Sequence, residues 1–478
     1  MKIRLVIKNK YFKMLSILFL LSVYSYPEDR TGCVKGNCKN GSGTYIYDNG
    51  SQYEGEFQER RKHGKGVYTF SNGDRYEGDY INGLKHGAGV YIFKDGKRFE
   101  GQYKDGKRHG NGEFTSPNGM RYVGEYKNGK EHGSGELILS SGEKYIGSMQ
   151  NGKYHGLGKC IYPNGDVFEG SFADGFSNGK GTLKYLNGDV YKGMMKQNKK
   201  HGDGEYFFNN GDKYIGTYSE DKRHGKGSQV YTNGDKYEGG FSEDTFHGMG
   251  KYIYANGDQY SGRFEVGKKI GKGSYRYGNG TTYLGEFKDD IKHGKGTIFY
   301  PSGDKYVGFF ENDTYHGNGK LNYANGNSYE GNFEKGERQG KGLFINPKGE
   351  RYEGDFIKGV YNGIGVFTFP NGDIYDGEFT DGKQTGFGTF INSFGEKYTG
   401  QYIDGIRQGY GTYFWPSGDR YKGEWEKNMR NGYGILNKDG QENQCGLWLN
   451  GKLDKKEEKQ IVMQKLKSKY PKINEWEK

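Results

Sequence analysis

Aromatic residues and glycine alternate along this chain, and the pattern recurs every 23 residues. Seventeen consecutive units run from Tyr53 to Asn443. Numbering each unit 1 to 23, position 1 is always Tyr or Phe, position 5 is aromatic in fifteen units and Met in two, and positions 3, 12 and 14 are always Gly. Side chains alternate between the faces of a strand, so positions 1, 3 and 5 share one face of a first strand and positions 12, 14, 16 and 18 one face of a second. The pattern predicts two strands per unit.

Turn-forming residues separate these strands at fixed places. Position 8 is Gly, Asn or Asp in sixteen of the seventeen units, with Arg60 as the exception. Position 21 is Gly in sixteen units, and six of the eight prolines stand at position 19. Gly, Asn and Asp tolerate a left-handed backbone, and Pro-x-Gly closes a strand. Each unit is therefore predicted to be a β-hairpin. We expect Gly at positions 3, 12 and 14 because an aromatic ring lies across the neighbouring backbone there.

A fixed period over most of a chain is typical of repeat architectures, in which each unit contacts mainly its neighbours. The predicted fold is all-β: an elongated single-layer antiparallel sheet of stacked 23-residue β-hairpins with a short C-terminal helical cap. We expect a degenerate N-terminal capping repeat over residues 27–52, seventeen repeats over 53–443 and a half repeat over 444–453. Residues 454–478 form a helical cap and tail, with one helix from Asp454 to Lys469.

The N-terminus has the pattern of an export signal. Residues 1–13 carry five basic and no acidic residues, and the apolar run from Met14 to Tyr26 follows. Thirteen apolar residues suit the core of a signal peptide and are short for a bilayer span. We therefore predict a signal peptide over residues 1–26 and an exported protein, whether secreted, periplasmic or on the cell surface. The alternative is a protein anchored in a membrane by an uncleaved N-terminal segment.

The chain has four cysteines, and two of them lie close together in the first, degenerate unit. Cys33 and Cys38 flank its turn, where a disulfide would staple the exposed edge of the sheet, and export would permit one. Cys160 occupies position 16, which elsewhere is rich in Tyr, Phe and Leu, so we expect it to be buried and inert.

The repeat pattern Y-x-G-x-F-x-x-G-x-x-H-G-x-G resembles the MORN (membrane occupation and recognition nexus) repeat over roughly residues 30–450. The resemblance implies a twisted single sheet with aromatic side chains along one side. It also implies a role as a scaffold, a dimerisation module or a membrane-contact module, because members of the family serve in these ways. A shared fold does not fix which of these roles applies.

All ten histidines occupy position 11, which could indicate a metal ladder or a pH sensor. Equivalent residues of neighbouring units would lie about 10 Å apart, too far for one zinc ion to bridge. We therefore interpret the histidines as structural and predict no metal, no cofactor and no enzymatic activity. The G-x-G pairs lie in strands and are not followed by a helix, so they do not indicate a nucleotide site. The histidines are His63, His86, His109, His132, His155, His201, His224, His247, His293 and His316.

The formal net charge of +11 belongs largely to the two ends of the chain. Residues 27–451 hold 57 basic and 55 acidic residues, so the repeat surface is nearly neutral and nucleic acid is not an expected partner. Basic residues recur at positions 10 and 23, and acidic residues at positions 2 and 22. We interpret these rows as a solvated face with cross-strand ion pairs. A continuous anion-binding strip is the alternative.

These observations favour a non-enzymatic, exported scaffold that mediates protein–protein interaction through an aromatic trough. The alternative is a peripheral protein that binds anionic lipid through its basic rows and tail, for which the near-neutral repeats predict weak membrane association. The sequence does not identify a protein partner, and a second copy meeting the chain end to end is a further candidate. The candidate trough residues are Tyr191, Tyr206, Tyr214, Tyr218, Tyr231, Tyr237, Phe241, Tyr252 and Tyr254.

Overall fold

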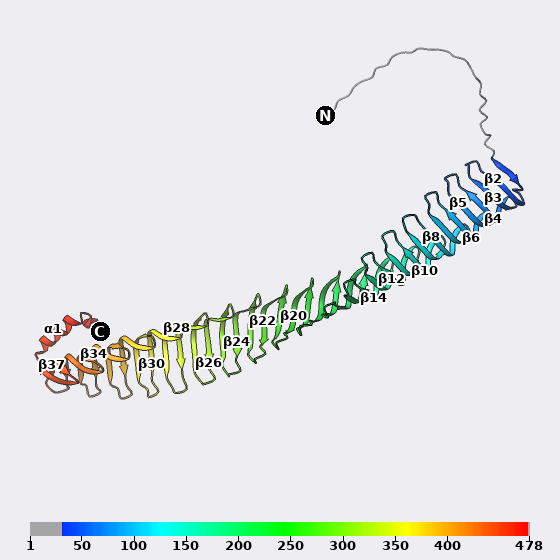
Figure 1. Ribbon diagram of the computed structural model, residues 1–478. Helices are drawn as coiled ribbons and strands as arrows, with labels where there is room; N and C mark the ends of the chain where they lie inside the picture. Colours follow the sequence, from blue (N-terminus) through cyan, green and yellow to red (C-terminus); the bar gives the residue numbers. More distant parts are fainter. Residues whose placement is uncertain (1–30, 477–478) are drawn as a thin grey trace, which may run out of the picture. The chain divides into compact units, whose positions relative to one another are not determined.

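The computed structural model describes residues 31–476 and divides into two units, the first ending at Phe176 and the second beginning at Ser177. Each unit is a single-layer antiparallel sheet in which consecutive strands pair (Figure 1). The predicted all-β fold of stacked hairpins is thereby confirmed. The predicted signal peptide falls on residues outside the described part of the chain.

The first unit contains strands β1 to β13. Their bounds are β1 Gly32–Gly36, β2 Gly41–Ile46, β3 Gln52–Gln58, β4 Arg61–Thr69, β5 Arg75–Ile81, β6 Leu84–Ile92, β7 Arg98–Lys104, β8 Lys107–Thr115, β9 Arg121–Lys127, β10 Lys130–Ile138, β11 Lys144–Gln150, β12 Lys153–Ile161 and β13 Val167–Ala173.

The second unit contains the remaining strands and two helices, with the first residue of β14 at the boundary. Their bounds are β14 Phe176–Lys184, β15 Val190–Lys196, β16 Lys199–Phe207, β17 Lys213–Ser219, β18 Lys222–Val230, β19 Lys236–Ser242, β20 Thr245–Ile253, β21 Gln259–Glu265, β22 Lys268–Arg276, β23 Thr282–Lys288, β24 Ile291–Phe299, β25 Lys305–Glu311, β26 Thr314–Asn322, β27 Ser328–Glu334, β28 Glu337–Ile345, β29 Arg351–Ile357, β30 Val360–Thr368, β31 Ile374–Thr380, β32 Lys383–Ile391, β33 Lys397–Ile403, β34 Ile406–Phe414, β35 Arg420–Glu426, β36 Met429–Asn437, β37 Gln444–Leu449, β38 Lys452–Lys456, α1 Lys459–Lys469 and α2 Ile473–Trp476.

Two turns of fixed type join the strands. Within a hairpin, positions 7 and 8 both have positive φ, as at Asn82 (50°) and Gly83 (84°), which is the geometry of a type I′ turn. Arg60 adopts the same conformation at position 8, with φ of 65°, although it is neither Gly, Asn nor Asp. Between hairpins, the N–H of Phe70 donates to the carbonyl of Asp74 at 2.8 Å, and the N–H of Gly73 donates to that of Phe70 at 2.9 Å.

Glycine forms a row across the sheet where the aromatic rings need room. Gly193 at position 3 pairs with Gly204 at position 14, which pairs in turn with Gly216 of the next repeat. A Cβ atom on Gly204 would lie 2.4 Å from Cε2 of Tyr191. The predicted reason for Gly at positions 3 and 14 is therefore confirmed.

Glycine at position 12 has a different reason from the one predicted. The strand register shifts between Gly216 and Tyr218, opposite residues 223–227, and this irregularity contains position 12. Gly225 at that position has φ of 71°, where an L-residue is strained. The backbone of the bulge requires glycine here, and no ring lies against it: an added Cβ would meet the side chain of Thr217.

The first hairpin contains the predicted disulfide. Cys33 in β1 and Cys38 in the following turn are bonded, with their Cα atoms 5.9 Å apart. Cys160 is buried and reduced, and burial raises the pKa of its thiol to about 12. Cys445 is likewise a buried free cysteine.

The C-terminal helix begins later than predicted. Residues 452–456, partly assigned to the helix from sequence, continue the hairpin as β38, where Lys455 pairs with Leu447 of β37. Helix α1 starts at Lys459 and buries Val462 and Leu466. These side chains pack with Tyr410, Ile435 and Cys445, which occupy positions 13, 15 and 2 of their repeats, so the cap covers the face opposite the aromatic positions 1 and 5.

Candidate binding face

The rings at positions 1 and 5 form a sealed inner layer. Tyr214 contacts Tyr218 of its own repeat and Phe241 of the next edge to face, with ring centroids 5.3 and 5.0 Å apart. The Tyr214 hydroxyl donates to the carbonyl of Thr217 at 3.0 Å, and burial raises its pKa to about 12. These rings supply the packing energy of the sheet, because edge-to-face pairs add to the burial of apolar area.

The side chain at position 10 covers the inner ring of its own repeat. Four repeats place an aromatic residue there, as where Phe246 stacks on Tyr237 with centroids 3.8 Å apart. Ten repeats place Lys or Arg there instead. Arg407 lies 4.7 Å from the ring of Trp425 and 5.4 Å from that of Tyr398, within the range of a cation–π interaction. The other stacked pairs are Tyr145–Tyr154, Tyr306–Tyr315 and Tyr352–Tyr361.

A second, outer row of rings lies at positions 16 and 18. Tyr252 contacts Tyr254 of the same strand at 4.5 Å between centroids. Tyr254 contacts Tyr275 of the next repeat at 6.0 Å, and Tyr275 contacts Tyr277 at 4.5 Å. These rings are half-buried and therefore keep accessible surface. We call this row, together with the position-10 side chains beside it, the outer ladder.

The structure divides the nine candidate trough residues into two sets. Five are buried in the inner layer and present almost no surface: Tyr191, Tyr214, Tyr218, Tyr237 and Phe241. Four are half-buried in the outer ladder: Tyr206, Tyr231, Tyr252 and Tyr254. Only the second set is placed to contact a partner.

Position 10 was assigned to a solvated charged face, and that interpretation is wrong for this row. Its aliphatic stems and charged heads lie on aromatic rings, so the row belongs to the aromatic face. The signal was present in the sequence, since Lys, Arg, Tyr and Phe interchange at position 10 and all of them pack well on a ring.

Most position-10 cations between residues 200 and 300 have an acidic partner. The partner is the carboxylate at position 8 of the following repeat. Asp244 pairs with Arg223 at 3.1 Å, and Asp290 pairs with Lys269 at 3.6 Å. Lys292 Nζ lies 3.4 Å from Asp313 and donates to the Tyr277 hydroxyl at 2.9 Å. Burial lowers the pKa of Lys292, but these two partners outweigh burial and raise it.

The cations of the first unit lack that partner. Lys62, Lys85 and Arg108 stand at position 10 of three consecutive repeats, and position 8 of the repeat after each is Gly. Within residues 31–476, no carboxylate forms an ion pair with any of the three. Burial, followed by the neighbouring charges of Lys62 and Arg108, lowers the pKa of Lys85 to about 8. This part of the face therefore carries uncompensated positive charge.

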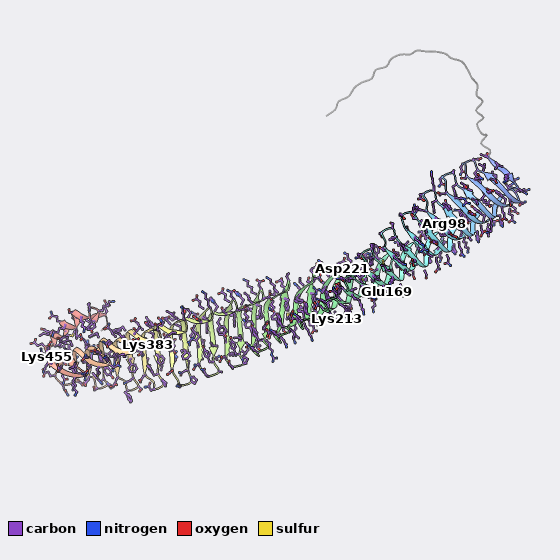
Figure 2. All side chains as sticks on the ribbon, viewed as in Figure 1. Arg98, Glu169, Lys213, Asp221, Lys383 and Lys455 are labelled. Carbon is purple, nitrogen blue, oxygen red and sulfur yellow. A yellow bond between two sulfur atoms is a disulfide. The ribbon has the colours of Figure 1, made fainter. Side chains whose placement is uncertain are left out.

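The opposite face carries the predicted solvated charges at positions 2 and 23, but only some of its ion pairs cross between strands: Arg75–Glu77 and Arg98–Glu100 each lie within one strand. The acidic row at position 22, also predicted to be solvated, instead bonds to the outer ladder, as Asp74 does to the Tyr91 hydroxyl. Arg75 pairs with Glu77 at 2.7 Å, Arg98 pairs with Glu100, and Lys213 pairs with Glu205 at 3.2 Å. Arg98 and Lys213 are labelled in Figure 2. Exposed pairs of this kind contribute little to stability, about 0–1 kcal/mol each.

The position-11 row lies at the bulge beside position 12. Two of its amide members bond to the next repeat: the side-chain oxygen of Gln339 accepts from the N–H of Lys358 at 3.1 Å, and that of Gln408 accepts from the N–H of Lys427 at 3.2 Å. Nδ1 of His63 and of His201 is buried without a hydrogen-bond partner among the described atoms. Within residues 31–476, no group of three His, Cys, Asp or Glu side chains is arranged to hold a metal ion.

The hairpin geometry and the row of inner rings define a class of β-hairpin repeat protein. The MORN repeat family matches eighteen consecutive segments of the chain between residues 31 and 441, the first at 31–52 and the last at 421–441. The chain belongs to the MORN repeat family. A search of curated proteins finds no match.

Three solved structures show a distant similarity to the chain. The TCP domain of SAS-4 from Drosophila melanogaster, in complex with a proline-rich motif of Ana2, is 15% identical over 37% of this chain and 89% of that one, with a TM-score of 0.22. The TCP10 domain of CPAP from Danio rerio, in complex with a peptide of STIL, is 11% identical over 54% and 94%, with a TM-score of 0.17. Virginiamycin B lyase from Staphylococcus aureus is 12% identical over 63% and 98%, with a TM-score of 0.11. Similarities at these TM-scores do not bear on function.

Neither helix in the described part of the chain has the length and hydropathy needed to cross a bilayer.

Proposed function

We propose that this protein is a non-catalytic, exported scaffold that binds a partner protein along the outer ladder. The observation that supports this most directly is that the inner rings are buried whereas the rings of the outer ladder keep accessible surface. Tyr237 is fully buried, whereas Tyr252 and Tyr254 beside it are half-buried and continue into the next repeat through Tyr275. A continuous row of accessible aromatic surface is typical of an interaction site, because Tyr provides a large contact area at low entropic cost.

Two further features support parts of this proposal. The inner-ring hydroxyls are committed to backbone carbonyls, as Tyr260 is to Arg263 at 3.1 Å, so the repeats use their polar groups for structure. The Cys33–Cys38 disulfide is consistent with an oxidising compartment outside the cytosol. The apolar run at residues 14–26 adds the expectation of export.

Site-specific photo-crosslinking tests this proposal. A photoreactive phenylalanine analogue replaces Tyr254 in the outer ladder or, as control, Met249 of the same repeat. Met249 lies at position 13 on the opposite face and is 70% exposed, so it is at least as accessible. We expect polypeptide adducts, formed in the native compartment, from position 254 and few from position 249. Equal yields at both positions would contradict the proposed face.

Peripheral binding to anionic membranes is the second candidate. The uncompensated cations at Lys62, Lys85 and Arg108 favour it, while the near-neutral charge of residues 27–451 opposes it. We expect weak binding to vesicles containing phosphatidylserine at low salt, lost by 0.15 M salt because exposed charges are screened within about 8 Å. Deleting residues 452–478 would strip β38 and α1 from the sheet, so charge substitutions at Lys455 and Lys467 are the cleaner test of the tail. Tight binding at 0.15 M salt would favour the membrane function.

A further inference from the structure

In the first unit, three consecutive position-10 cations each lie among four aromatic rings. Lys62 Nζ lies 4.3 to 5.9 Å from the centroids of its four rings, Lys85 Nζ 4.2 to 5.7 Å, and the Arg108 guanidinium carbon 4.5 to 5.9 Å. The rings around the three cations are, in order, Tyr47, Tyr53, Tyr68 and Tyr80; Phe70, Tyr76, Tyr91 and Tyr103; and Phe93, Phe99, Phe114 and Tyr126.

Among residues 31–476, no carboxylate forms an ion pair with the cations in these aromatic cages. Arg223, Lys269 and Lys292 each pair with a carboxylate at position 8 of the following repeat. In the repeats that follow Lys62, Lys85 and Arg108, position 8 is glycine. The carboxylate of Asp74 acts on Lys85 through space, but its oxygens are engaged by the Tyr91 hydroxyl at 2.7 Å and the Lys94 N–H at 2.8 Å. A half-buried cation without a carboxylate is costly, so the site is suited to an anion supplied by another molecule.

The row has defined ends. Glu131 occupies position 10 of the next repeat and reverses the sign there. At the other end, Lys39 occupies position 10 of the degenerate first repeat and lines a pocket of about 590 Å³ with Tyr45, Tyr47 and Arg60. The positive stretch therefore covers position 10 of four consecutive repeats, with Lys39 exposed and the three caged cations half-buried.

The spacing of the row selects the shape of an anionic ligand. Each repeat contributes two strands, so neighbouring cations are about 10 Å apart along the sheet. A peptide in the polyproline II conformation has three residues per turn and rises about 3.1 Å per residue, so every third side chain points the same way about 9 Å further on. A β-strand would turn residues i and i+3 to opposite faces.

We propose that Lys62, Lys85 and Arg108 bind an acidic segment of a partner protein in an extended polyproline II conformation, with carboxylates at every third residue. The segment lies across the strands, its carboxylates meet the three cations, and its intervening residues pack on the outer rings Tyr68, Phe70, Tyr91 and Phe93. These rings form a continuous path, with centroid separations of 4.5 Å for Tyr68–Phe70, 5.5 Å for Phe70–Tyr91 and 4.5 Å for Tyr91–Phe93. The proposal rests on the proposed scaffold function and names the chemistry of one partner segment.

The test measures binding of fluorescent nine-residue peptides to the full chain by anisotropy. The spaced peptide has the sequence EPAEPAEPA, the clustered peptide EEEPAPAPA has the same composition, and QPAQPAQPA lacks charge. We expect the spaced peptide to bind at least tenfold more tightly than either control. The variant K62Y/K85Y/R108Y should lose this preference while keeping the fold, because Tyr at position 10 stacks on the inner ring at Tyr154, Tyr315 and Tyr361.

The matched control is R223Y/K269Y/K292Y, which removes three position-10 cations that already have carboxylate partners. We expect this variant to bind the spaced peptide as the wild type does. Lys85 gives a second readout: the bound peptide should slow its acetylation at pH 8 several-fold, measured by mass spectrometry, while leaving the exposed Lys65 unaffected.

Three outcomes would overturn the proposal: equal affinity for the spaced and clustered peptides, undiminished binding by K62Y/K85Y/R108Y, or binding of phosphatidylserine vesicles through these cations without binding of the peptide. Failure here is distinguishable from failure of the scaffold function. The crosslinking test at Tyr254 probes the other unit of the chain and does not depend on the cations of the first unit.

Discussion

The hydroxyl of Tyr91 donates a 2.7 Å hydrogen bond to the carboxylate of Asp74, which lies at the end of the preceding repeat. The other oxygen of Asp74 accepts from the N–H of Lys94 at 2.8 Å. The same arrangement joins Asp235 to Tyr252 and Ala255, at 2.8 and 2.7 Å. Position 22 therefore links each such repeat to the next one at the level of the outer ladder.

We predict that this link fails in acid. The Lys94 N–H and then the Tyr91 hydroxyl hold the pKa of Asp74 below its usual value, and the Thr232 N–H acts similarly on Asp212. A depressed folded-state pKa stabilises the fold above the unfolded pKa of about 3.9, and that contribution is lost as the pH falls through the folded value. The melting temperature should therefore drop below about pH 4.

The variant Asp74→Ala isolates this effect. It removes two hydrogen bonds between repeats and should cost about 1–2 kcal/mol at pH 7, with a smaller difference from wild type at pH 2.5. Asp95→Ala is the control, because Asp95 is exposed and pairs only with Lys97 among the described residues. Thermal melts by circular dichroism decide the matter, and equal effects of the two substitutions at pH 7 would contradict a linking role for Asp74.

Adding a side chain to the glycine row should be far more damaging than adding one beside it. Gly204→Val would place its Cβ 2.4 Å from Cε2 of Tyr191, so we predict a cost of about 1–3 kcal/mol from overpacking. Glu205→Val changes the next residue, which points to the other face and pairs with Lys213, and should be mild. Chemical denaturation of both variants measures the difference. Similar costs would mean that the ring does not require the glycine.

The features predicted correctly from sequence are those set by local geometry. Type I′ turns need positive φ, so position 8 could be recognised from its Gly, Asn and Asp residues. A buried ring needs a neighbour without a side chain, so Gly204 and its equivalents could be recognised as well. The proximity of Cys33 and Cys38 followed from the hairpin turn between them. Each of these depends on a few neighbouring residues, so a 23-residue pattern is enough to reveal it.

The features missed depend on competition between interactions. Lys85 was assigned to solvent because it is charged, yet its stem packs on the rings of Tyr76 and Tyr91, and the exchange of Lys and Arg with Tyr and Phe at position 10 was the one sequence signal for this packing. Gly225 was assigned to ring packing, whereas a bulge in the strand pairing sets its φ. The chain from Asp454 to Lys456 has helix-forming residues, but pairing with β37 outweighs that preference.

Lys85 should make the stability increase with pH, as Asp74 does, but in the alkaline range instead of the acid range. Its pKa is lowered by burial to about 8, so between pH 8 and the unfolded value of about 10.4 the unfolded chain binds more protons. Stability from this group therefore increases as the pH rises through that range. Lys85→Met should stabilise the protein relative to wild type at pH 6.5, and the advantage should shrink by pH 9.5.

Lys104→Met provides the comparison for this measurement, because Lys104 is exposed at position 6 of the repeat that follows the repeat of Lys85. Its effect on the melting temperature should be small and nearly independent of pH between 6.5 and 9.5. If Lys85→Met behaves in the same way, the uncompensated charge in the aromatic cage has no energetic cost.

Removing the disulfide should loosen the first hairpin and leave the distant repeats unchanged. In the chain-entropy model, a disulfide that closes a loop of this length adds about 2 kcal/mol to the free energy of unfolding. Each repeat contacts mainly its neighbours, so the loss of the disulfide should destabilise mainly the adjacent repeats. In Cys33→Ser/Cys38→Ser, hydrogen exchange of residues 32–46 should accelerate, while residues 214–236 keep their wild-type rates. Uniform acceleration along the chain would argue against local stapling.

In wild type, Cys160 should resist alkylation at pH 8, because burial raises the pKa of its thiol to about 12.

The stability of the helical cap should depend on the buried side chains of α1, Val462 and Leu466, and hardly at all on its exposed side. Leu466 is fully buried among Tyr410, Ile435 and Cys445, so Leu466→Ala should cost about 2–4 kcal/mol in the stability of the last hairpins. Ile461 is 43% exposed on the same helix, and Ile461→Ala should change stability by less than about 0.5 kcal/mol. Thiol labelling reports the loss locally: in Leu466→Ala, Cys445 should become reactive toward thiol reagents as α1 detaches, while Cys160 stays protected. Unchanged protection of Cys445 would mean that β37 is buried without the helix, and the cap would then have no stabilising role.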